Sequence, residues 1–379
     1  MKIGLVIDAQ NERLELEISK TFIRDMSTID RALINLLAKR CELLGKTRAD
    51  QTASDILSFM DQYYERTSQN PINLDCGSIL GEKSVISESI TKWLRHADSI
   101  YLSHTQCDKV AYLGPEFSYS HLAAIKAFGD AMPMIGLATI PSVFESISRN
   151  DSGLGIVPIE NTTDGRIADT MSMLIRSDVK ICGEVLLPIH HNLLSKSSKE
   201  QIVEVHSKPQ AISQCRNWLG MHLPNAITVE SNSTAAAAEL ASKVPGVAAI
   251  ASMEAARHYE LDAIDTDIED NPNNVTRFAV LSNKFGLRSG KDKTTILFQV
   301  PHKPGSLADA MAIFKKLALN LTWIESFPLL GSSSEYLFFI ETDGFFDDAP
   351  VADAIQVLSS MTLMIKVVGS YPKAISQKG

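Results

Sequence analysis

Residues 273–281 read NNVTRFAVL, in which two asparagines are followed by an apolar run. Asparagine favours turns, whereas valine, phenylalanine and leucine favour a buried strand. Thr276 and Arg277 therefore lie where a loop becomes a strand. A β-branched threonine is common at the start of a strand, so strand formation alone explains the pattern. The alternative is that a hydroxyl is required at the rim of a cleft.

Short apolar runs of the same kind precede this stretch from about residue 110. A helix-like segment separates each run from the next, which is the pattern of an α/β sheet. The runs are VAYLG (110–114), GLGIVPI (153–159), VKICGEVLL (179–187), IVEVHS (202–207), AITVE (226–230) and VAAIA (247–251). The sequence thus predicts an α/β domain over residues 107–284.

The residues on either side of this domain follow other patterns. Apolar residues recur at helical spacing between Asp25 and Lys46 and again in two later segments, which predicts an all-α N-terminal domain over residues 1–106. After a linker rich in glycine and lysine, residues 294–372 alternate as strand, helix, strand, strand, helix, strand. That order predicts an α+β ferredoxin-like domain. A chain of 379 residues is long enough for all three domains.

Composition excludes several classes of protein. With 45% hydrophobic and 21% charged residues and no apolar run of bilayer length, we expect a globular protein without a membrane role. The short apolar patch before Asp8 does not fit a secretion signal, so a cytoplasmic location is expected. A formal net charge of −9 without a basic cluster argues against nucleic acid as a partner.

Metal chemistry is not indicated either. The five cysteines are far apart and form no C-x-x-C pair, so neither a disulfide framework nor a zinc site is encoded. His190 and His191 are adjacent, and adjacent residues on a strand point to opposite faces. Because no acidic residue is spaced to chelate with them, we expect no metal site.

Polar residues gather after several of the predicted strands. The carboxyl ends of strands in open α/β sheets are where ligands bind. Each cluster alone is explained by a helix cap or a turn, but several in one domain indicate a shared site. The candidates are Glu160 and Asn161 in IENTTDG (159–165), Ser118 in LGPEFSYSH (113–121), Ser207 and Gln214 in HSKPQAISQC (206–215), Thr234 in ESNSTAAAAEL (230–240), and Thr276 in NVTRF (274–278).

In order and spacing, these motifs resemble those of the prephenate dehydratases, from about Val110 to Leu281. The resemblance implies a two-lobed α/β catalytic domain similar to the periplasmic binding proteins. It also implies the substrate prephenate, which loses carbon dioxide and water to become phenylpyruvate, and it implies no cofactor. The chain is then expected to act in L-phenylalanine biosynthesis.

The resemblance also suggests roles for individual residues. Thr276 matches the family's catalytic threonine, and its hydroxyl is expected to donate a hydrogen bond to the departing oxygen. Glu160 is the expected proton source if burial raises its pKa above the ordinary value of about 4.3. Asn161, Ser207 and Gln214 match positions that line the cleft and would orient the substrate.

Anion binding has several candidates. An anionic substrate suits the helix N-termini at Ser118 and Thr234, and Arg277 is a candidate partner for a carboxylate. Strand alternation points Arg277 away from the threonine beside it, so a structural role is at least as well supported. The chain departs from the family in having Phe117 in place of a glycine and Lys208 in place of a histidine.

The segments GSLADA (305–310) and IESFP (324–328) resemble the phenylalanine-sensing ACT domain that follows the catalytic domain in this family. The family typically has an arginine where this chain has Phe327, so an altered regulatory site is expected. ACT sites usually form between subunits, which implies a homodimer or homotetramer with L-phenylalanine as effector. The expected regulatory residues are Gly305, Ser306, Leu307, Glu325 and Ser326.

The stretch IDRALINLLAKR (29–40) resembles the all-helical chorismate mutases. Their reaction requires several cations around a dicarboxylate. Arg40 matches one of these cations and Arg48 is a second candidate. Arg24 lies one residue out of register with the family's first arginine, which corresponds to a rotation of about 100° around the helix. We therefore expect residues 1–106 to convert chorismate slowly or not at all.

Three alternatives stay open. The protein could be fully bifunctional, with an active chorismate mutase domain beside the dehydratase. It could be an arogenate dehydratase, which carries out the same elimination on the amino-acid analogue. It could also be a non-catalytic amino-acid-binding sensor, because two α/β lobes around a cleft describe solute-binding proteins as well.

Overall fold

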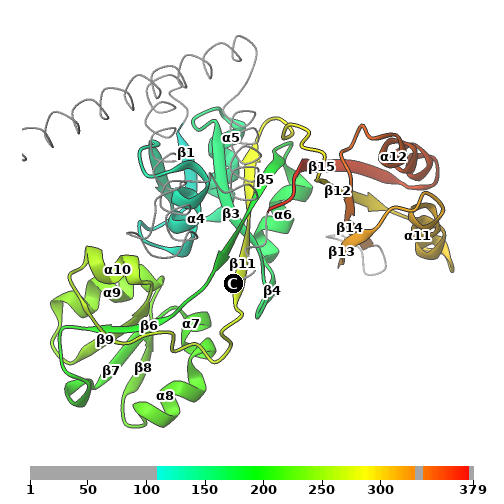
Figure 1. Ribbon diagram of the computed structural model, residues 1–379. Helices are drawn as coiled ribbons and strands as arrows, with labels where there is room; N and C mark the ends of the chain where they lie inside the picture. The colour runs from blue at the N-terminus through cyan, green and yellow to red at the C-terminus, as the bar shows by residue number, and fades with distance from the viewer. Residues whose placement is uncertain (1–108, 329–335, 375–379) are drawn as a thin grey trace, which may run out of the picture. The chain divides into compact units, whose positions relative to one another are not determined.

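The structure is a computed structural model that describes residues 109–328 and 336–374 (Figure 1). By its internal contacts the chain divides into residues 1–52 and 53–379, and every described residue belongs to the second unit. The helical domain expected at 1–106, with Arg40 and Arg48, lies outside the described residues. Within the described ranges, no helix has both the length and the apolar character needed to cross a membrane.

The first lobe is built on a mixed sheet of apolar strands. In pairing order its strands are β5 (Lys180–Pro188), β11 (Val275–Ser282), β3 (Leu154–Asn161), β1 (Val110–Leu113) and β2 (Met134–Leu137), and β4 (Gly165–Arg166) pairs with β3. β1 is parallel to β2 and β3, whereas β11 runs antiparallel to β3 and β5. The strand predicted from NNVTRFAVL is confirmed as β11, which has a neighbouring strand on each side.

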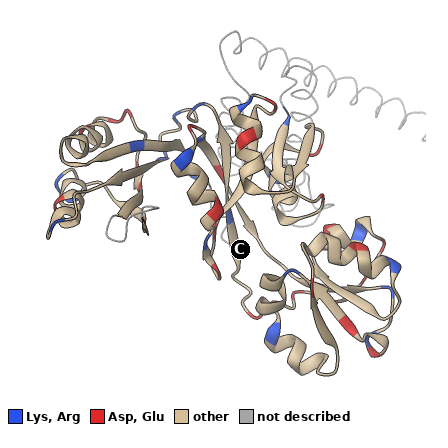
Figure 2. Cartoon of the chain, turned by 180° about the vertical axis from the view of Figure 1, so that it is seen from behind, with Lys and Arg blue, Asp and Glu red and all other residues tan. Residues whose placement is uncertain are grey.

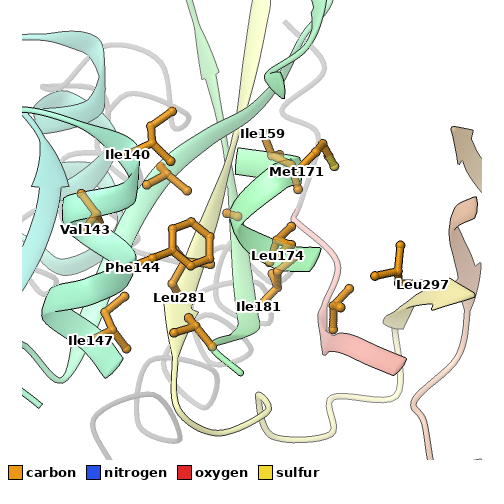
Figure 3. Packing of buried hydrophobic residues seen from close by; sticks show 14 of the residues in the cluster. Ile140, Val143, Phe144, Ile147, Ile159, Met171, Leu174, Ile181, Leu281 and Leu297 are labelled. Carbon is orange, nitrogen blue, oxygen red and sulfur yellow. The ribbon is translucent and has the colours of Figure 1, made fainter. Parts of the chain in front are cut away.

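Helices cover both faces of this sheet. α4 (Tyr119–Phe128) packs on one face together with Ile156 and Phe278. α5 (Ile140–Ser148) and α6 (Ala168–Arg176) pack on the other, where their side chains surround Leu281 (Figure 3). Because alternate strand residues point to opposite faces, Thr276 shares the α4 face with Phe278, and Arg277 shares the opposite face with Leu281.

The second lobe has a sheet of its own. In pairing order the strands are β10 (Asp262–Asp265), β6 (Asn192–Ser195), β9 (Val247–Ala251), β7 (Glu204–Ser207) and β8 (Ile227–Glu230). Its helices are η1 (Lys199–Gln201), α7 (Pro209–Gln214), α8 (Arg216–His222), α9 (Thr234–Lys243) and α10 (Met253–His258). The chain enters this lobe after β5 and leaves it before β11, so the expected two-lobed α/β domain is present.

The C-terminal part has the predicted βαββαβ order. Its elements are β12 (Asp292–Gln299), α11 (Ser306–Lys316), β13 (Leu321–Pro328), β14 (Tyr336–Asp343), α12 (Ala349–Met361) and β15 (Met364–Pro372). β15 also pairs with β5 of the first lobe at Gly369 and Ile181. A Cβ at Gly369 would lie 2.7 Å from Cβ of Ile181, so this close approach of two strands requires glycine.

Candidate active site

A hydrogen bond between two neighbouring strands forms the centre of the site. Thr276 on β11 and Asn161 on β3 are paired residues, and Nδ2 of Asn161 donates to Oγ1 of Thr276 over 2.8 Å. Both residues are buried, with 8% and 7% of their surface exposed. The Thr276 oxygen is the acceptor in this bond, so its hydroxyl hydrogen is available to donate to a ligand.

The backbone fixes the orientation of the Asn161 carboxamide. Its Oδ1 accepts from the N–H groups of Thr163 and Asp164 over 2.8 and 3.0 Å. Because an amide oxygen accepts and an amide nitrogen donates, Nδ2 has to face Thr276. The other Nδ2 hydrogen goes to Oδ1 of Asn274 over 2.8 Å, and Asn274 is almost fully buried in the turn before β11.

These hydrogen bonds continue into the second lobe. Nδ2 of Asn274 donates to Oε1 of Gln214 over 3.0 Å, and Nε2 of Gln214 donates to Asp164 over 2.9 Å. Nε2 of His191 lies 2.8 Å from the same Gln214 oxygen. We call this set, from Thr276 through Asn161, Asn274 and Gln214 to His191, the polar chain. Sequence analysis had singled out three of its members and missed Asn274 and His191.

His191 ends the polar chain in a buried environment. Its Nδ1 lies 3.0 Å from the hydroxyl oxygen of Tyr119, whose single hydrogen also has the carbonyl oxygen of His190 within reach, 2.6 Å away. Burial lowers the pKa of His191, although its bond to Gln214 and the charge of Glu269 act in the opposite direction. Burial also raises the pKa of Tyr119 well above its ordinary value. At neutral pH the two side chains are therefore an uncharged imidazole and an uncharged phenol.

Glu160 does not join the polar chain, because β3 contains a bulge. Arg277 pairs with Glu160, but the next β11 residue pairs with Pro158, so Ile159 is an extra residue. In a regular strand Glu160 would share the face of Ile156 and Thr276. The bulge turns it to the opposite face, where its carboxylate lies 3.1 Å from Nε of Arg277. Glu160 thus faces away from Thr276 in the structure, and its role as a proton source stays a prediction.

Arg277 lies in a buried ionic cluster on the face opposite to Thr276. Its Nη1 is 2.8 Å from both oxygens of Glu341 and 3.2 Å from Glu184, and the Trp323 ring centroid is 4.6 Å from its Cζ. Burial acts to lower the pKa of Arg277, but the nearby carboxylates outweigh burial and raise it. Arg277 therefore joins β11 to the C-terminal strands, which is the structural role given above as the alternative to substrate binding. We call Arg277, Glu160, Glu184, Glu341 and Lys293 the Arg277 cluster.

Helix N-termini lie at two of the predicted positions. Ser118 is the N-cap of α4, where its Oγ accepts from the His121 N–H over 3.4 Å. In α9 the N-cap is Ser233, and the predicted Thr234 is the first helical residue. Both helices thus present N–H groups that could face an anion.

Ser207 forms a hydrogen bond within the second lobe. It is fully buried at the end of β7, and its Oγ donates to the Ile250 carbonyl oxygen over 2.7 Å. Among the described residues, no hydrogen bond connects Ser118, Ser207 or Thr234 to the polar chain. Ser118 and Ser207 bond to nearby backbone groups, and substrate binding by these three residues stays a prediction.

The two departures from the family motifs have structural consequences. Phe117 adopts a left-handed backbone conformation with φ of 61°, which glycine adopts without strain. Its ring stacks on His258 of α10 at a centroid distance of 3.9 Å, so an aromatic contact between the lobes accompanies the strained backbone. Lys208 is an exposed residue directly before α7.

The expectation that His190 has no acidic partner is wrong. Nδ1 of His190 lies 2.8 Å from Glu269 and 3.5 Å from Asp267, and the ligand atoms of the three residues lie within 4.8 Å of one another. Asp267 and His190 are exposed, and both Glu269 oxygens already accept hydrogen bonds, one from the backbone N–H of His191.

The predicted regulatory residues occupy two places in the C-terminal part. Gly305, with φ of 89°, is the N-cap of α11 and is followed by Ser306 and Leu307. Glu325 and Ser326 lie on β13, where Glu325 forms an ion pair with Arg166. The Phe327 ring centroid lies 4.8 Å from Cζ of the same arginine. β13 is therefore in contact with β4, which pairs with β3, the strand that carries Asn161.

Comparison with known proteins identifies the family. The prephenate dehydratase family model matches residues 110–285. A bifunctional chorismate mutase/prephenate dehydratase of Aquifex aeolicus is 34% identical over 367 residues, which cover 96% of this chain and 100% of the relative. The prephenate dehydratase of Bacillus subtilis is 32% identical over 279 residues, which cover 69% of this chain and 98% of the relative. The chain belongs to the prephenate dehydratase family.

Solved structures show the same fold. A prephenate dehydratase from Arthrobacter aurescens in complex with L-Phe has a TM-score of 0.66 and 32% identity, and the match covers 72% of this chain and 92% of that chain. GqqA, described as a novel type of quorum-quenching acylase, has a TM-score of 0.64 and 27% identity, and the match covers 70% and 98% of the two chains. The same fold therefore occurs in proteins with different described activities, and the fold alone does not identify the activity.

Proposed function

We propose that this chain is a prephenate dehydratase, which removes carbon dioxide and water from prephenate to form phenylpyruvate. The observation that carries the proposal is the Thr276 hydroxyl, whose oxygen accepts from Asn161 while its hydrogen is available to a ligand. Membership of the family and the order of its motifs along the chain support the same activity.

The reaction needs a hydrogen-bond donor at the departing oxygen. The electron pair of the bond to the ring carboxylate moves into the ring as carbon dioxide leaves, and the ring hydroxyl departs and takes up a proton to become water. A donor held in place stabilises the negative charge that develops on that oxygen. Threonine is too weak an acid to protonate it outright, so the role of Thr276 is hydrogen-bond donation.

Prephenate also carries two carboxylates that have to be bound. Arg277 is engaged in its cluster, and acidic and basic residues are interspersed along the described elements (Figure 2). Local donors therefore have to hold the carboxylates. The N-termini of α4 and α9, at Ser118 and Ser233, offer backbone N–H groups for this purpose.

The similarity to an acylase raises acyl transfer as a competing function. A threonine nucleophile requires an adjacent general base. In the described part of the chain, the group bonded to the Thr276 hydroxyl is the Asn161 amide nitrogen, which donates and cannot accept a proton. This geometry favours the dehydratase over the acylase.

The C-terminal part is proposed to be an ACT domain that senses L-phenylalanine. Its βαββαβ order, the left-handed Gly305 at the start of α11, and the complex of a similar dehydratase with L-Phe support this assignment. Such sites usually lie between subunits, so a homodimer or homotetramer in the cytoplasm is proposed. Because Trp323 and Glu341 cover Arg277, removing residues after 285 would disturb the catalytic sheet as well as the sensor.

A chorismate mutase activity is a second candidate. The similarity to the bifunctional enzyme of Aquifex aeolicus extends over 96% of this chain, which favours a mutase domain at residues 1–106. The small number of matching cations favours slow conversion or none. A kcat of about 1 to 10³ s⁻¹ with chorismate, abolished by Arg40→Ala, would establish the bifunctional enzyme.

The purified full-length protein should be assayed with prephenate, arogenate and chorismate, each with and without L-phenylalanine. Phenylpyruvate formation from prephenate is the expected result. Turnover of arogenate alone would instead identify an arogenate dehydratase, and binding without turnover would identify a sensor.

Thr276→Val tests the residue on which the proposal rests. The substitution keeps the β-branched shape, and kcat should fall about 10²-fold or more, the usual effect of removing one positioned donor. Thr362→Val removes a hydroxyl that donates to the Leu358 carbonyl oxygen at the end of α12 and is the matched control. Normal turnover by Thr276→Val would contradict the role given to its hydroxyl.

A further inference from the structure

His191 is a buried titratable side chain that the proposed mechanism does not yet use. Only 2% of its surface is exposed, so it is not placed to bind the substrate directly. It nevertheless lies at the end of the polar chain that begins at Thr276. It also lies between the lobes, since Tyr119 comes from α4 of the first lobe and Gln214 from α7 of the second.

Every hydrogen bond in the polar chain has a determined direction. Two backbone N–H groups bind Oδ1 of Asn161, so its Nδ2 donates to both Thr276 and Asn274. Asn274 accepts with Oδ1 and therefore donates with Nδ2 to Oε1 of Gln214. An amide oxygen carries no hydrogen, so Nε2 of His191 has to be the donor in its bond to Gln214.

This requirement determines the tautomer of His191. With the hydrogen on Nε2, the neutral ring has its lone pair on Nδ1, so Nδ1 and the His190 carbonyl oxygen share the single hydroxyl hydrogen of Tyr119 as acceptors. Protonation of Nδ1 would leave the Nε2–H bond to Gln214 unchanged. The charged and titratable groups around the ring are Glu269, His190 and Asp164, in addition to Tyr119.

The two polar groups of the Gln214 carboxamide have partners that differ in their exposure to solvent. Its nitrogen donates to Asp164, which is exposed, and water competes for such a bond. Its oxygen accepts from the buried His191, where a hydrogen bond is stronger and an unpaired oxygen is more costly. His191 is therefore the partner that more strongly constrains the Gln214 carboxamide.

We propose that His191 is a positioning residue for the dehydration. Its Nε2–H holds Gln214, which aligns Asn274 and Asn161, so that Asn161 donates to Thr276 and the threonine hydrogen is left for the departing oxygen. This inference rests on the proposed dehydratase function. Because His191 does not contact the substrate in this proposal, its replacement should lower kcat and leave prephenate binding nearly unchanged.

Three substitutions at position 191 distinguish a donor from a space-filling side chain. His191→Gln keeps an N–H group near the position of Nε2, whereas His191→Asn is too short to reach Gln214 and His191→Leu has no donor. We expect kcat to fall by about 10²-fold in the leucine and asparagine variants, the scale of a misplaced catalytic group. KM for prephenate should stay within about threefold of the wild type, because uniform binding is retained.

The glutamine variant and a neighbouring residue provide the controls. His191→Gln should keep kcat within about tenfold of the wild type, since the Nε2 donor is restored. His190→Gln alters the adjacent exposed side chain, which is outside the polar chain, and should match the wild type. Equal kcat values for the glutamine and asparagine variants would overturn the proposal, and this comparison holds even if the leucine variant does not fold.

A spectroscopic measurement separates this inference from the proposed function. Nitrogen-15 correlation spectra of the His191 ring should show hydrogen on Nε2 and a hydrogen bond to Gln214, whether or not prephenate is turned over. A ring with hydrogen on Nδ1 alone would overturn the inference. Wild-type protein that binds but does not convert prephenate would overturn the dehydratase function and leave the spectroscopic result to decide the hydrogen-bond direction.

Discussion

Replacing Arg277 with methionine should destabilise the fold without weakening prephenate binding. The side chains of Glu341 and Glu184 are only 1% and 4% exposed. Without the guanidinium, these buried carboxylates still have Lys293 as a cationic partner, but its Nζ lies 2.9 Å from Glu184 and 3.9 Å from Glu341. Leaving one partner of a buried ion pair alone costs about 3–5 kcal/mol. For a domain of this size that corresponds to a fall in Tm of roughly 10 °C.

Urea and thermal denaturation followed by circular dichroism would measure this loss. Arg149→Met is the matched control, because Arg149 is 3.6 Å from Glu145 and both side chains are mostly exposed, where ion pairs contribute little. The double variant Arg277→Met/Glu341→Met should recover a large part of the lost stability, since it leaves no unpaired Glu341 carboxylate.

Prephenate kinetics of the Arg277→Met variant test whether this residue binds the substrate. KM should be unchanged, because Arg277 faces away from Thr276 and toward Trp323. A variant as stable as the wild type would show that the Arg277 cluster makes no net contribution to folding. A stable variant with a tenfold higher KM would favour substrate binding by Arg277 over the structural role.

Two further predictions concern pH and the effector. Burial lowers the pKa of both His191 and His121, so the unfolded chain binds protons more tightly than the folded chain. The contribution of these two histidines to the free energy of unfolding should be fully present above about pH 6.5 and should be lost as pH drops from there through the lowered pKa values. Urea denaturation near pH 5 and pH 7.5 checks this. The difference in stability between the two pH values should be smaller for His191→Gln. Calorimetry should show L-phenylalanine binding to the wild type and tighter binding to Phe327→Arg, whereas no binding to either protein would contradict the ACT assignment.

Local patterns in the sequence predicted most of the described fold. The apolar runs at 110–114, 153–159 and 179–187 are strands, and βαββαβ is the order of the C-terminal part. Neighbouring residues determine such patterns through turn formation and strand alternation, so they can be recognised without knowledge of the partners. The motif positions of Thr276, Asn161 and Gln214 were also recognisable, and the structure brings these three side chains together.

Only the tertiary structure decided how several site residues point and what they bind. A single extra residue, Ile159, turns Glu160 away from Thr276, and strand alternation cannot reveal where a bulge lies. Glu341 binds Arg277 although the two residues are 64 positions apart in the sequence, and Asn274 binds Gln214 across 60 positions. The sequence determined which residues could donate, accept or carry charge. Pairing of distant strands determined which of them meet, because those contacts depend on sheet register and burial and not on local order.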